Sequence, residues 1–232
     1  MKVQDMTTTQ INHAMKKTDA LVMEGVLGQR YLGNAFTKGS YELHGYAGNG
    51  FASFLNGAHM TLYGNAQEAC ADTMSSGLVC IHGNCGDALA YGMRGGQVFV
   101  SGNCGARCGI HMKEYQEETL MVIGGTAKSF LGEYVSGGTI LVLNQELKRL
   151  PVGRYCGIGA HGGAIYARVT NLIAGWEQVD EQTLATLQCI VERYCQQMSI
   201  DPSIFHEGIF IRKCRSEQNP YEGLYIDDGR RK

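Results

Sequence analysis

Apolar residues recur along this chain at an interval of 19 residues, far longer than the period of a single helix or strand. Segments 43–45, 62–64, 81–83 and 100–102 each place an apolar residue two positions before a Gly, and they follow one another at this interval. A fifth copy, 122–124, comes after a step of 22 residues. A repeat of this length is typical of a solenoid, in which each repeat forms one coil that stacks on its neighbours.

Aligning the copies on the Gly places apolar residues in four columns. Two columns, four and two residues before the Gly, alternate with other residues as the inward face of a strand does. They contain Tyr41, Met60, Val79, Val98 and Leu120, and Leu43, Leu62, Ile81, Val100 and Val122. The columns six and ten residues after the Gly contain Phe51, Cys70, Leu89, Cys108 and Phe130, and Leu55, Met74, Met93, Met112 and Tyr134. The pattern predicts an all-β fold of stacked parallel strands, with about seven coils between residues 21 and 170.

Other solenoids fit this spacing less well. Leucine-rich repeats need Leu at a spacing that is absent here, and calcium-binding nonapeptide repeats need an Asp in each copy, where only Asp87 is suitably placed. Hexapeptide helices require a multiple of six residues. A parallel β-helix with about three short faces per coil is therefore the preferred fold.

One outward column changes character along the chain. Three residues before the Gly, polarity falls through Glu42, Thr61, Cys80, Phe99 and Met121, and then Leu141 on the next strand. Exposed apolar surface of this kind marks an interaction site. We therefore expect this face to dock a partner or the chain's own terminal helix.

The two ends of the chain depart from the repeat. Residues 7–17 predict a short helix capped by Thr7 or Thr8, and residues 180–198 predict a longer one capped by Asp180 and stopped by Pro202. The segment 219–232 is polar and is expected to form an arm. The predicted organisation is an N-terminal extension (1–20), a β-helix domain (21–170) and a helical C-terminal extension with a polar tail (171–232).

The composition supports a scaffold built on glycine turns. The chain has 232 residues, of which 32 are Gly and only 3 are Pro, which excludes collagen. Gly is expected where the backbone needs positive φ or where two coils approach too closely for a Cβ. The glycines predicted to play this structural role are Gly45, Gly64, Gly83, Gly102, Gly124, Gly96, Gly138 and Gly163.

Charge and hydropathy limit the binding partners and the cellular compartment that we expect. A net charge of -2 gives no support to nucleic-acid binding. The sequence contains neither an apolar run of membrane-spanning length nor an N-terminal secretion signal. Nine Cys without a signal suggest free thiols in a reducing compartment. We therefore expect a cytoplasmic protein that does not contact a membrane.

The candidate chemical groups are better explained by architecture than by catalysis. The Cys residues occupy packing columns and lack the spacing of zinc or redox pairs. His44 and His82 lie in an outward column, and Asn65, Asn84 and Asn103 predict a hydrogen-bonded ladder at one corner. Repeated Gly-Asn-Cys-Gly segments superficially resemble phosphate loops, but no predicted helix follows them. No catalytic, cofactor-binding or metal-ligating residue is assigned.

A polar segment, 111–119, interrupts the stack. It is expected to be either a site of partner contacts or a solvated loop.

The repeat itself resembles a known family. The segment 83–96, Gly-Asn-Cys-Gly-Asp-Ala-Leu-Ala-Tyr-Gly-Met-Arg-Gly-Gly, is followed by an apolar strand and Gly102-Asn103. Together with the entry turn 28–33 and the pairs Gly137-Gly138 and Gly162-Gly163, it resembles the GXGXG domain over about residues 20–170. That family includes the C-terminal domain of the glutamate synthase large (alpha) subunit and one of the subunits of formylmethanofuran dehydrogenase.

The resemblance implies a right-handed parallel β-helix with a structural role. In glutamate synthase this domain braces the glutamine amidotransferase domain against the flavin-binding synthase domain. The chain would then be a free-standing subunit of an oxidoreductase complex that makes glutamate from glutamine and 2-oxoglutarate. FMN and iron–sulfur clusters would lie in partner subunits, with none in this chain. The family motif consists of structural glycines, so no catalytic residue is carried over.

Alternative functions stay open at this stage. The chain is also compatible with a scaffold like the GXGXG subunit of formylmethanofuran dehydrogenase, or with an independent β-helix hydrolase or binding module. Self-association is a further possibility.

Overall fold

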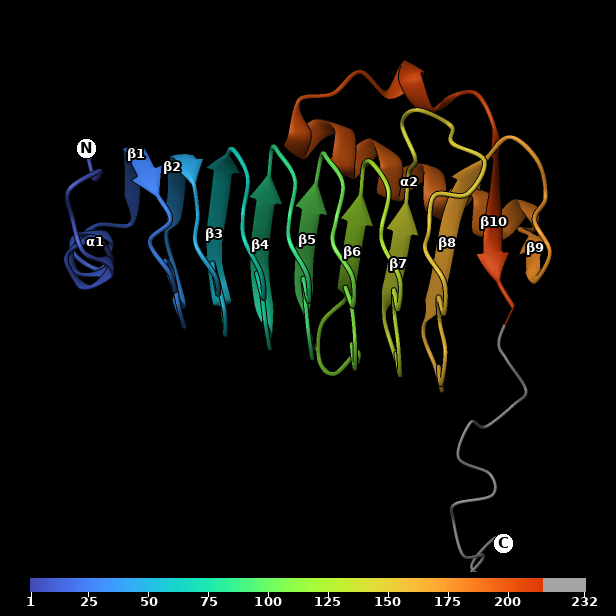
Figure 1. The fold of residues 1–232 in the computed structure, drawn as a ribbon, viewed down its shortest axis with the longest axis horizontal. Coiled ribbons are helices and arrows are strands. Elements are labelled where there is room, and N and C mark those ends of the chain that lie inside the picture. Colours follow the sequence, from blue (N-terminus) through green and yellow to red (C-terminus); the bar gives the residue numbers. More distant parts are fainter. Residues whose placement is uncertain (215–232) are drawn as a thin grey trace, which may run out of the picture.

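The structure, a computed structural model, describes residues 1–214. Within this range, eight parallel strands lie side by side in chain order and form one face of a parallel β-helix (Figure 1). Their bounds are β1 Ala20–Leu27, β2 Ser40–Tyr46, β3 Asn56–Tyr63, β4 Ser76–Ile81, β5 Gly96–Val100, β6 Thr119–Ile123, β7 Thr139–Val142 and β8 Ala164–Val169. The fold predicted from the 19-residue repeat is therefore confirmed.

The inward columns of the early repeats stack as the spacing predicts. Met60 pairs with Tyr41 on one side and Val79 on the other, and Val79 pairs with Val98. These side chains are almost completely buried in one continuous core that runs along the inside of the coils. Each coil buries its apolar face only by stacking on its neighbours, which is the source of solenoid stability.

The structure corrects the alignment of the fifth repeat. Val98 and Val100 pair with Met121 and Ile123, so the step past the 111–119 segment is 23 residues rather than 22. Gly125, and not Gly124, therefore lies next to Gly102 and donates a hydrogen bond to its carbonyl oxygen at 2.9 Å.

This one-residue shift exchanges the two faces of β6, because successive side chains of a strand point to opposite sides. Met121, predicted to point outward, belongs to the core, whereas Leu120 and Val122, predicted to point inward, lie on the outer face. Leu131 and Val135 likewise take the core positions predicted for the residues that precede them, Phe130 and Tyr134.

Each coil contains a turn in which alternate residues have a left-handed backbone. After β4 these residues are Ala88, Ala90 and Gly92, with φ of 58°, 55° and 60°. The Ala88 N–H donates forward to Ala106 and the Ala90 N–H donates back to Cys70, each at 2.8 Å. These bonds to both neighbouring coils satisfy the backbone in a conformation that residues other than Gly rarely adopt.

The repeat glycines lie where neighbouring coils approach most closely. At Gly64, which has φ of +150°, an added Cβ would collide with the carbonyl oxygen of Gly45. At Gly83 a Cβ would lie 2.5 Å from the Oδ1 of Asn65. Positive φ values of 88°, 82° and 64° occur at the glycines that open or precede β5, β7 and β8, namely Gly96, Gly138 and Gly163.

Both ends of the β-helix are covered. Helix α1 (Thr8–Met15) is capped by Thr7, as predicted, and buries Ile11 and Met15 against the first coil. At the other end, β10 (Ile209–Lys213) pairs antiparallel with β8 and with β9 (Trp176–Gln178). The covers matter because an open coil presents unpaired backbone groups. The predicted arm, 219–232, lies outside the described residues.

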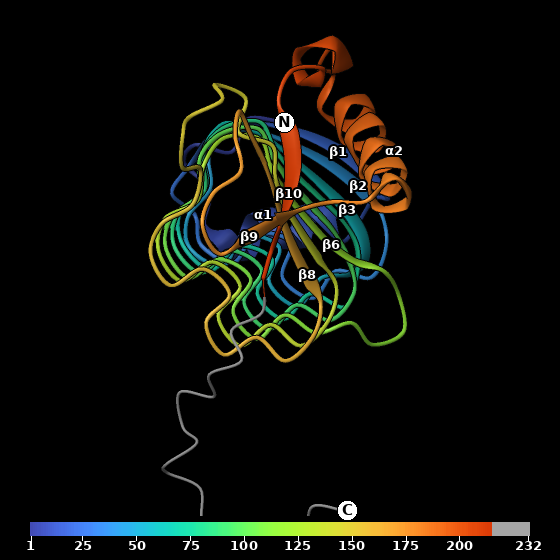
Figure 2. The same ribbon diagram turned by 90° about the vertical axis from the view of Figure 1, so that its right-hand side faces the viewer.

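The second predicted helix lies on the side of the coils rather than at their end. Helix α2 (Glu181–Met198) is capped by Asp180, as predicted, and ends in a left-handed Ser199, before the Pro202 expected to stop it. The view along the β-helix shows α2 outside the sheet, against its outer face (Figure 2). The short helix η1 (Pro202–Phe205) then leads the chain back to β10. Of the helices in residues 1–214, none combines the length and apolar character needed to cross a membrane.

Candidate interface on the outer face of the sheet

The outward column with falling polarity crosses six strands of the sheet. Strand pairing places its residues in register from β2 to β7, with Val122 in the position predicted for Met121. The column consists of Glu42, Thr61, Cys80, Phe99, Val122 and Leu141. The outer face divides into a covered half, under α2, and a bare half, formed by β1 to β3.

Helix α2 covers the apolar half of this column. Cys80, Phe99, Val122 and Leu141 form a buried cluster with the inward side of the helix. The helix contributes Leu187, Ile190, Val191, Tyr194, Cys195 and Met198. The chain's own terminal helix is therefore the cover for this half, one of the two occupants predicted from the sequence.

Tyr194 anchors α2 to the sheet. Its ring meets the ring of Phe99 edge to face, with centroids 5.7 Å apart, and its hydroxyl donates to the carbonyl oxygen of Val100 at 3.3 Å. Burial raises the pKa of the Tyr194 hydroxyl and raises that of the neighbouring Cys80 thiol to about 12. Both groups are therefore neutral hydrogen-bonding or packing groups at neutral pH.

The 111–119 segment also contacts the helix. The guanidinium of Arg193 on α2 forms an ion pair with Glu118, whose carboxylate also accepts from Gln97 at 3.1 Å. Part of the segment, whose role the sequence left open, thus helps to hold α2 in place.

Arg168 on β8 joins the end of the β-helix to the segment that follows α2. Its side chain is completely buried and donates to backbone carbonyl oxygens, including those of Leu143 at 2.9 Å and Glu207 at 2.7 Å. The guanidinium also lies 5.0 Å from the ring centroid of Phe205. Burial lowers its pKa, and the nearby Glu207 opposes that shift. The sequence carried no signal for this role, since Arg168 appears there only as a polar residue at a strand end.

The bare half of the outer face combines rings and carboxylates. Val22 and Tyr63 are 48% and 43% exposed. Tyr63 is stacked between His44 and His82, with ring centroids 4.8 and 4.4 Å apart. The His44 Nε2 lies 2.7 Å from a carboxylate oxygen of Glu42.

His82 stands at the boundary between the two halves. Its Nε2 is buried and has no hydrogen-bond partner within the described residues. Burial lowers the pKa of His82, and Glu42 opposes that shift. A buried polar atom without a partner is unfavourable, so His82 packs here at some cost in stability.

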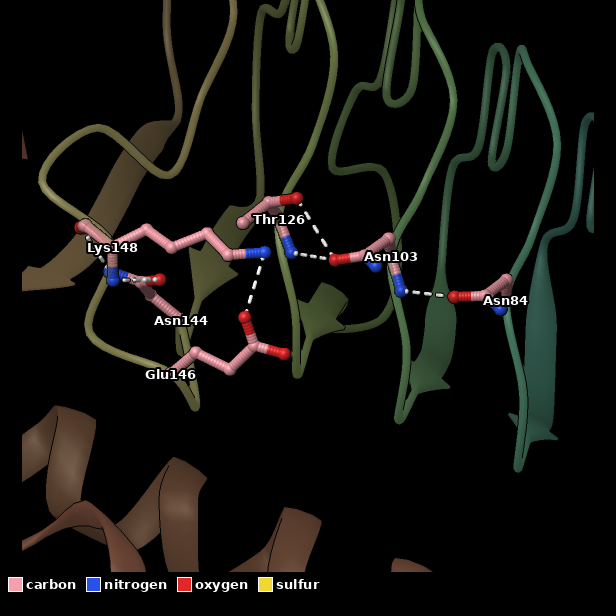
Figure 3. Close-up of polar contacts among 6 residues, drawn as sticks. All are labelled: Asn84, Asn103, Thr126, Asn144, Glu146 and Lys148. Carbon is pink, nitrogen blue, oxygen red and sulfur yellow. Dashed lines mark hydrogen bonds and ion pairs between the residues drawn. The ribbon is translucent and has the colours of Figure 1, made fainter.

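The asparagine ladder predicted from the sequence is present at the corner next to the strands. The Oδ1 of Asn84 accepts from the backbone of Asn103 at 2.8 Å, and the Oδ1 of Asn103 accepts from Thr126 at 2.9 Å (Figure 3). Asn65 continues the ladder to the preceding coil, where its Oδ1 accepts a hydrogen bond from the backbone N–H of Asn84 at 2.7 Å. These side-chain oxygens are therefore occupied by the stack itself.

The coil that follows β7 has Asn144 in place of the repeat Gly. Asn144, in a left-handed conformation in the Gly column, bonds in both directions with the backbone of Lys148 at 2.8 and 3.0 Å and closes a loop (Figure 3). Lys148 and Glu146 form an ion pair on this loop.

The interior cysteines are packed and hydrogen-bonded. The Cys70 thiol donates to the carbonyl of Gln67 at 3.3 Å, and the Cys108 thiol donates to that of Gly105 at 3.4 Å. A hydrogen bond with Cys70, together with burial, raises the pKa of the Cys85 thiol, and burial with a bond to Cys108 does the same for Cys104. Within residues 1–214, no group of three or more His, Cys, Asp or Glu side chains is arranged to hold a metal ion.

A groove of about 540 Å³ lies between α2 and the segment 202–210. Its apolar lining comes from Val179, Leu184, Val191, Phe205, Ile209 and Phe210. The groove belongs to the cover of the sheet and not to the β-helix.

Comparison with known proteins agrees with this architecture. The family model described as "GXGXG motif" matches residues 2–204. An uncharacterized protein of Methanocaldococcus jannaschii, MJ1350, is 39% identical over an alignment of 224 residues. The match covers 90% of this chain and 86% of the relative. The match extends beyond the coils into α2 and η1. The chain therefore belongs to the GXGXG motif family.

Proposed function

We propose that this chain is a structural subunit of a cytoplasmic glutamate synthase-like complex, which makes glutamate from glutamine and 2-oxoglutarate. In this role the β-helix braces a separately encoded amidotransferase subunit against a flavin-binding synthase subunit. FMN and iron–sulfur clusters belong to those partners. Family membership supports the proposal at the level of the domain.

The single observation that carries the proposal is the division of the outer face. The chain supplies its own helix to cover Phe99 and Leu141, yet it leaves Val22, Glu42 and Tyr63 of the same sheet uncovered. A rigid, partly covered sheet face is suited to receive another chain. Tyr is among the residues that contribute most to protein interfaces.

The charges on the bare half indicate the chemistry of its partner. Glu24 pairs with His44 from β1, and Glu42 lies two residues before His44 on β2; their carboxylate oxygens are 3.8 and 2.7 Å from the His44 Nε2. A partner surface that combines apolar side chains with Lys or Arg would complement both the carboxylates and the exposed rings.

Co-expression with the amidotransferase and synthase subunits of the same organism tests the proposal. We expect a tag on this chain to recover both subunits, with flavin and iron–sulfur absorbance and glutamine-dependent formation of glutamate. Recovery of the chain alone would contradict the proposal. Recovery of one-carbon enzymes, or turnover of an ester or polysaccharide by the isolated chain, would instead support one of the two alternative functions.

A further inference from the structure

A second surface lies in the turns, outside the sheet. After β5, β6 and β7, five of the left-handed turn positions carry large side chains, namely Arg107, His111, Phe130, Tyr134 and Tyr155, and the others are Gly. Apart from Phe54 and Thr73, the same positions after β2, β3 and β4 carry only Gly or Ala, among them Gly50, Ala69, Ala88 and Gly92. Positive φ is unfavourable for bulky residues, so the late coils keep these side chains against a local backbone preference.

The large side chains form two stacks that run across the turns of neighbouring coils. Phe130 and Tyr155 stack with centroids 4.9 Å apart, and His111 and Tyr134 stack at 5.2 Å. The guanidinium of Arg107 lies over Phe130, 5.2 Å from its centroid. Tyr155 is 56% exposed and His111 is also exposed, so each stack presents one ring to solvent.

Exposed cations accompany the rings. Arg107, Lys128 and Arg154 lie on the turns after β5, β6 and β7, and each is exposed. Within the described part of the chain, none of the three forms an ion pair with a carboxylate. The turns after β3 and β4 instead carry Glu68, Asp72 and Asp87. We call the late surface, formed by Arg107, His111, Lys128, Phe130, Tyr134, Arg154 and Tyr155, the turn patch.

We infer that the turn patch docks an acidic surface of one of the two catalytic subunits, while the bare half of the outer face docks the other. The inference rests on the proposed function, because a brace between two subunits needs two separate surfaces. The two surfaces differ in charge, with carboxylates on the bare half and, on the turn patch, cations that form no ion pair within residues 1–214. A partner that complements one surface is therefore disfavoured on the other. Tyr, Phe and Arg are also the side chains enriched at protein interfaces.

The charge pattern favours a protein partner over a nucleic acid. The chain carries a net charge of -2, and Glu133 lies between Phe130 and Tyr134 in the middle of the turn patch. Nucleic-acid affinity grows with the number of phosphates neutralised, and three cations interrupted by a carboxylate neutralise few.

Charge reversal within the repeat provides a matched experiment. Arg154 and Arg30 occupy the position directly before the first left-handed residue of their turns, Tyr155 and Tyr31, but only Arg154 belongs to the turn patch. The intact complex would be assembled with the wild-type chain, with Arg154→Glu, with Lys128→Glu/Arg154→Glu and with Arg30→Glu. Thermal melting of each chain would verify folding, and binding of each catalytic subunit would be measured separately at low and high salt.

The expected result is selective. The double variant should bind one subunit at least about tenfold more weakly while the other stays bound, and Arg30→Glu should match the wild type. High salt should reduce the difference in affinity between the wild-type chain and the double variant, because it screens the charges of the turn patch. Unchanged binding of both subunits by a folded double variant would overturn the inference while leaving the proposed function intact. Competition of the oligonucleotide (dT)15 for the turn patch would overturn it in favour of a nucleic acid. Failure of the wild-type chain to bind either subunit would overturn both proposals.

Discussion

The two halves of the outer face share one sheet, one register and one column of side chains, yet only one half is covered. In the covered half, Phe99 and Leu141 are 0% exposed beneath α2. In the bare half, Glu42 and Thr61 occupy the same column without a helix above them. The side chains of the column, rather than the backbone, therefore determine where the helix packs.

This difference shows that the same repeat can either bind the chain's own helix or leave its outer face open to another chain. An apolar column attracts the chain's own amphipathic helix, because burial removes apolar surface from water. A column with carboxylates and a half-exposed Tyr63 leaves room for another chain.

The largest expected effect comes from a charge beneath the helix. Phe99→Asp should destabilise the fold by about 4 kcal/mol, because it removes a buried ring and buries a carboxylate without a partner. Thr61→Asp, in the same column of the bare half, should cost only about 1 kcal/mol, because its carboxylate stays in contact with solvent although it lies beside Glu42. Urea unfolding of both variants measures the contrast, and equal losses would show that the two halves do not differ.

Arg168→Met should have the next largest effect. Several buried carbonyl oxygens, among them those of Leu143 and Glu207, would lose their donor, at a cost of about 3 kcal/mol. We expect hydrogen exchange to increase first in α2 and the 202–210 segment, because Arg168 joins them to β8. Unchanged exchange in α2 would contradict the anchoring role of Arg168.

Substitutions on the bare half should change the affinity for a partner subunit rather than the stability of the fold. Glu42→Lys/Tyr63→Ala is expected to weaken association with a catalytic subunit by about tenfold to a hundredfold, at nearly unchanged thermal stability. Tyr31→Ala, which removes another exposed ring outside this face, serves as the matched control. Titration of each chain against the partner subunits measures the effect, and equal affinities for all three chains would remove the bare half as an interface.

The smallest expected effect concerns pH. Burial lowers the pKa of His82 below its ordinary value of 6.5, so the unfolded chain takes up this proton first as pH falls. The His82 contribution to stability should thus be present above about pH 6.5 and be lost as pH falls below it. The difference between wild type and His82→Gln in unfolding experiments from pH 7.5 to 5.5 isolates this contribution, and a difference that does not vary with pH would contradict it.

The sequence predicted the fold where the two faces of a strand differ. In β2, polar residues alternate with Tyr41 and Leu43, so the inward face was unambiguous. In β6 all five residues are buried, because the core covers its inner face and α2 covers its outer face. Apolar and polar residues do not alternate in such a strand. Since Gly124 and Gly125 are adjacent, the sequence is compatible with two alignments of this repeat.

Other features depend on contacts that a local pattern does not contain. The left-handed Ala88 and Ala90 are held by hydrogen bonds to neighbouring coils, against the local preference of Ala. The sequence indicated that α2 exists and that an apolar column needs a cover, but it did not show that the two meet. Arg168 is an anchor only because η1 returns to it, which no spacing along the strand indicates.

The most direct test of the account is hydroxyl-radical footprinting of the outer face in the free chain and in the assembled complex. Tyr63 should be labelled in the free chain and lose most of its labelling in the complex, whereas Phe99 and Tyr194 should stay protected in both. Equal labelling of Tyr63 in both states would contradict the claim that the uncovered half of the sheet receives a partner.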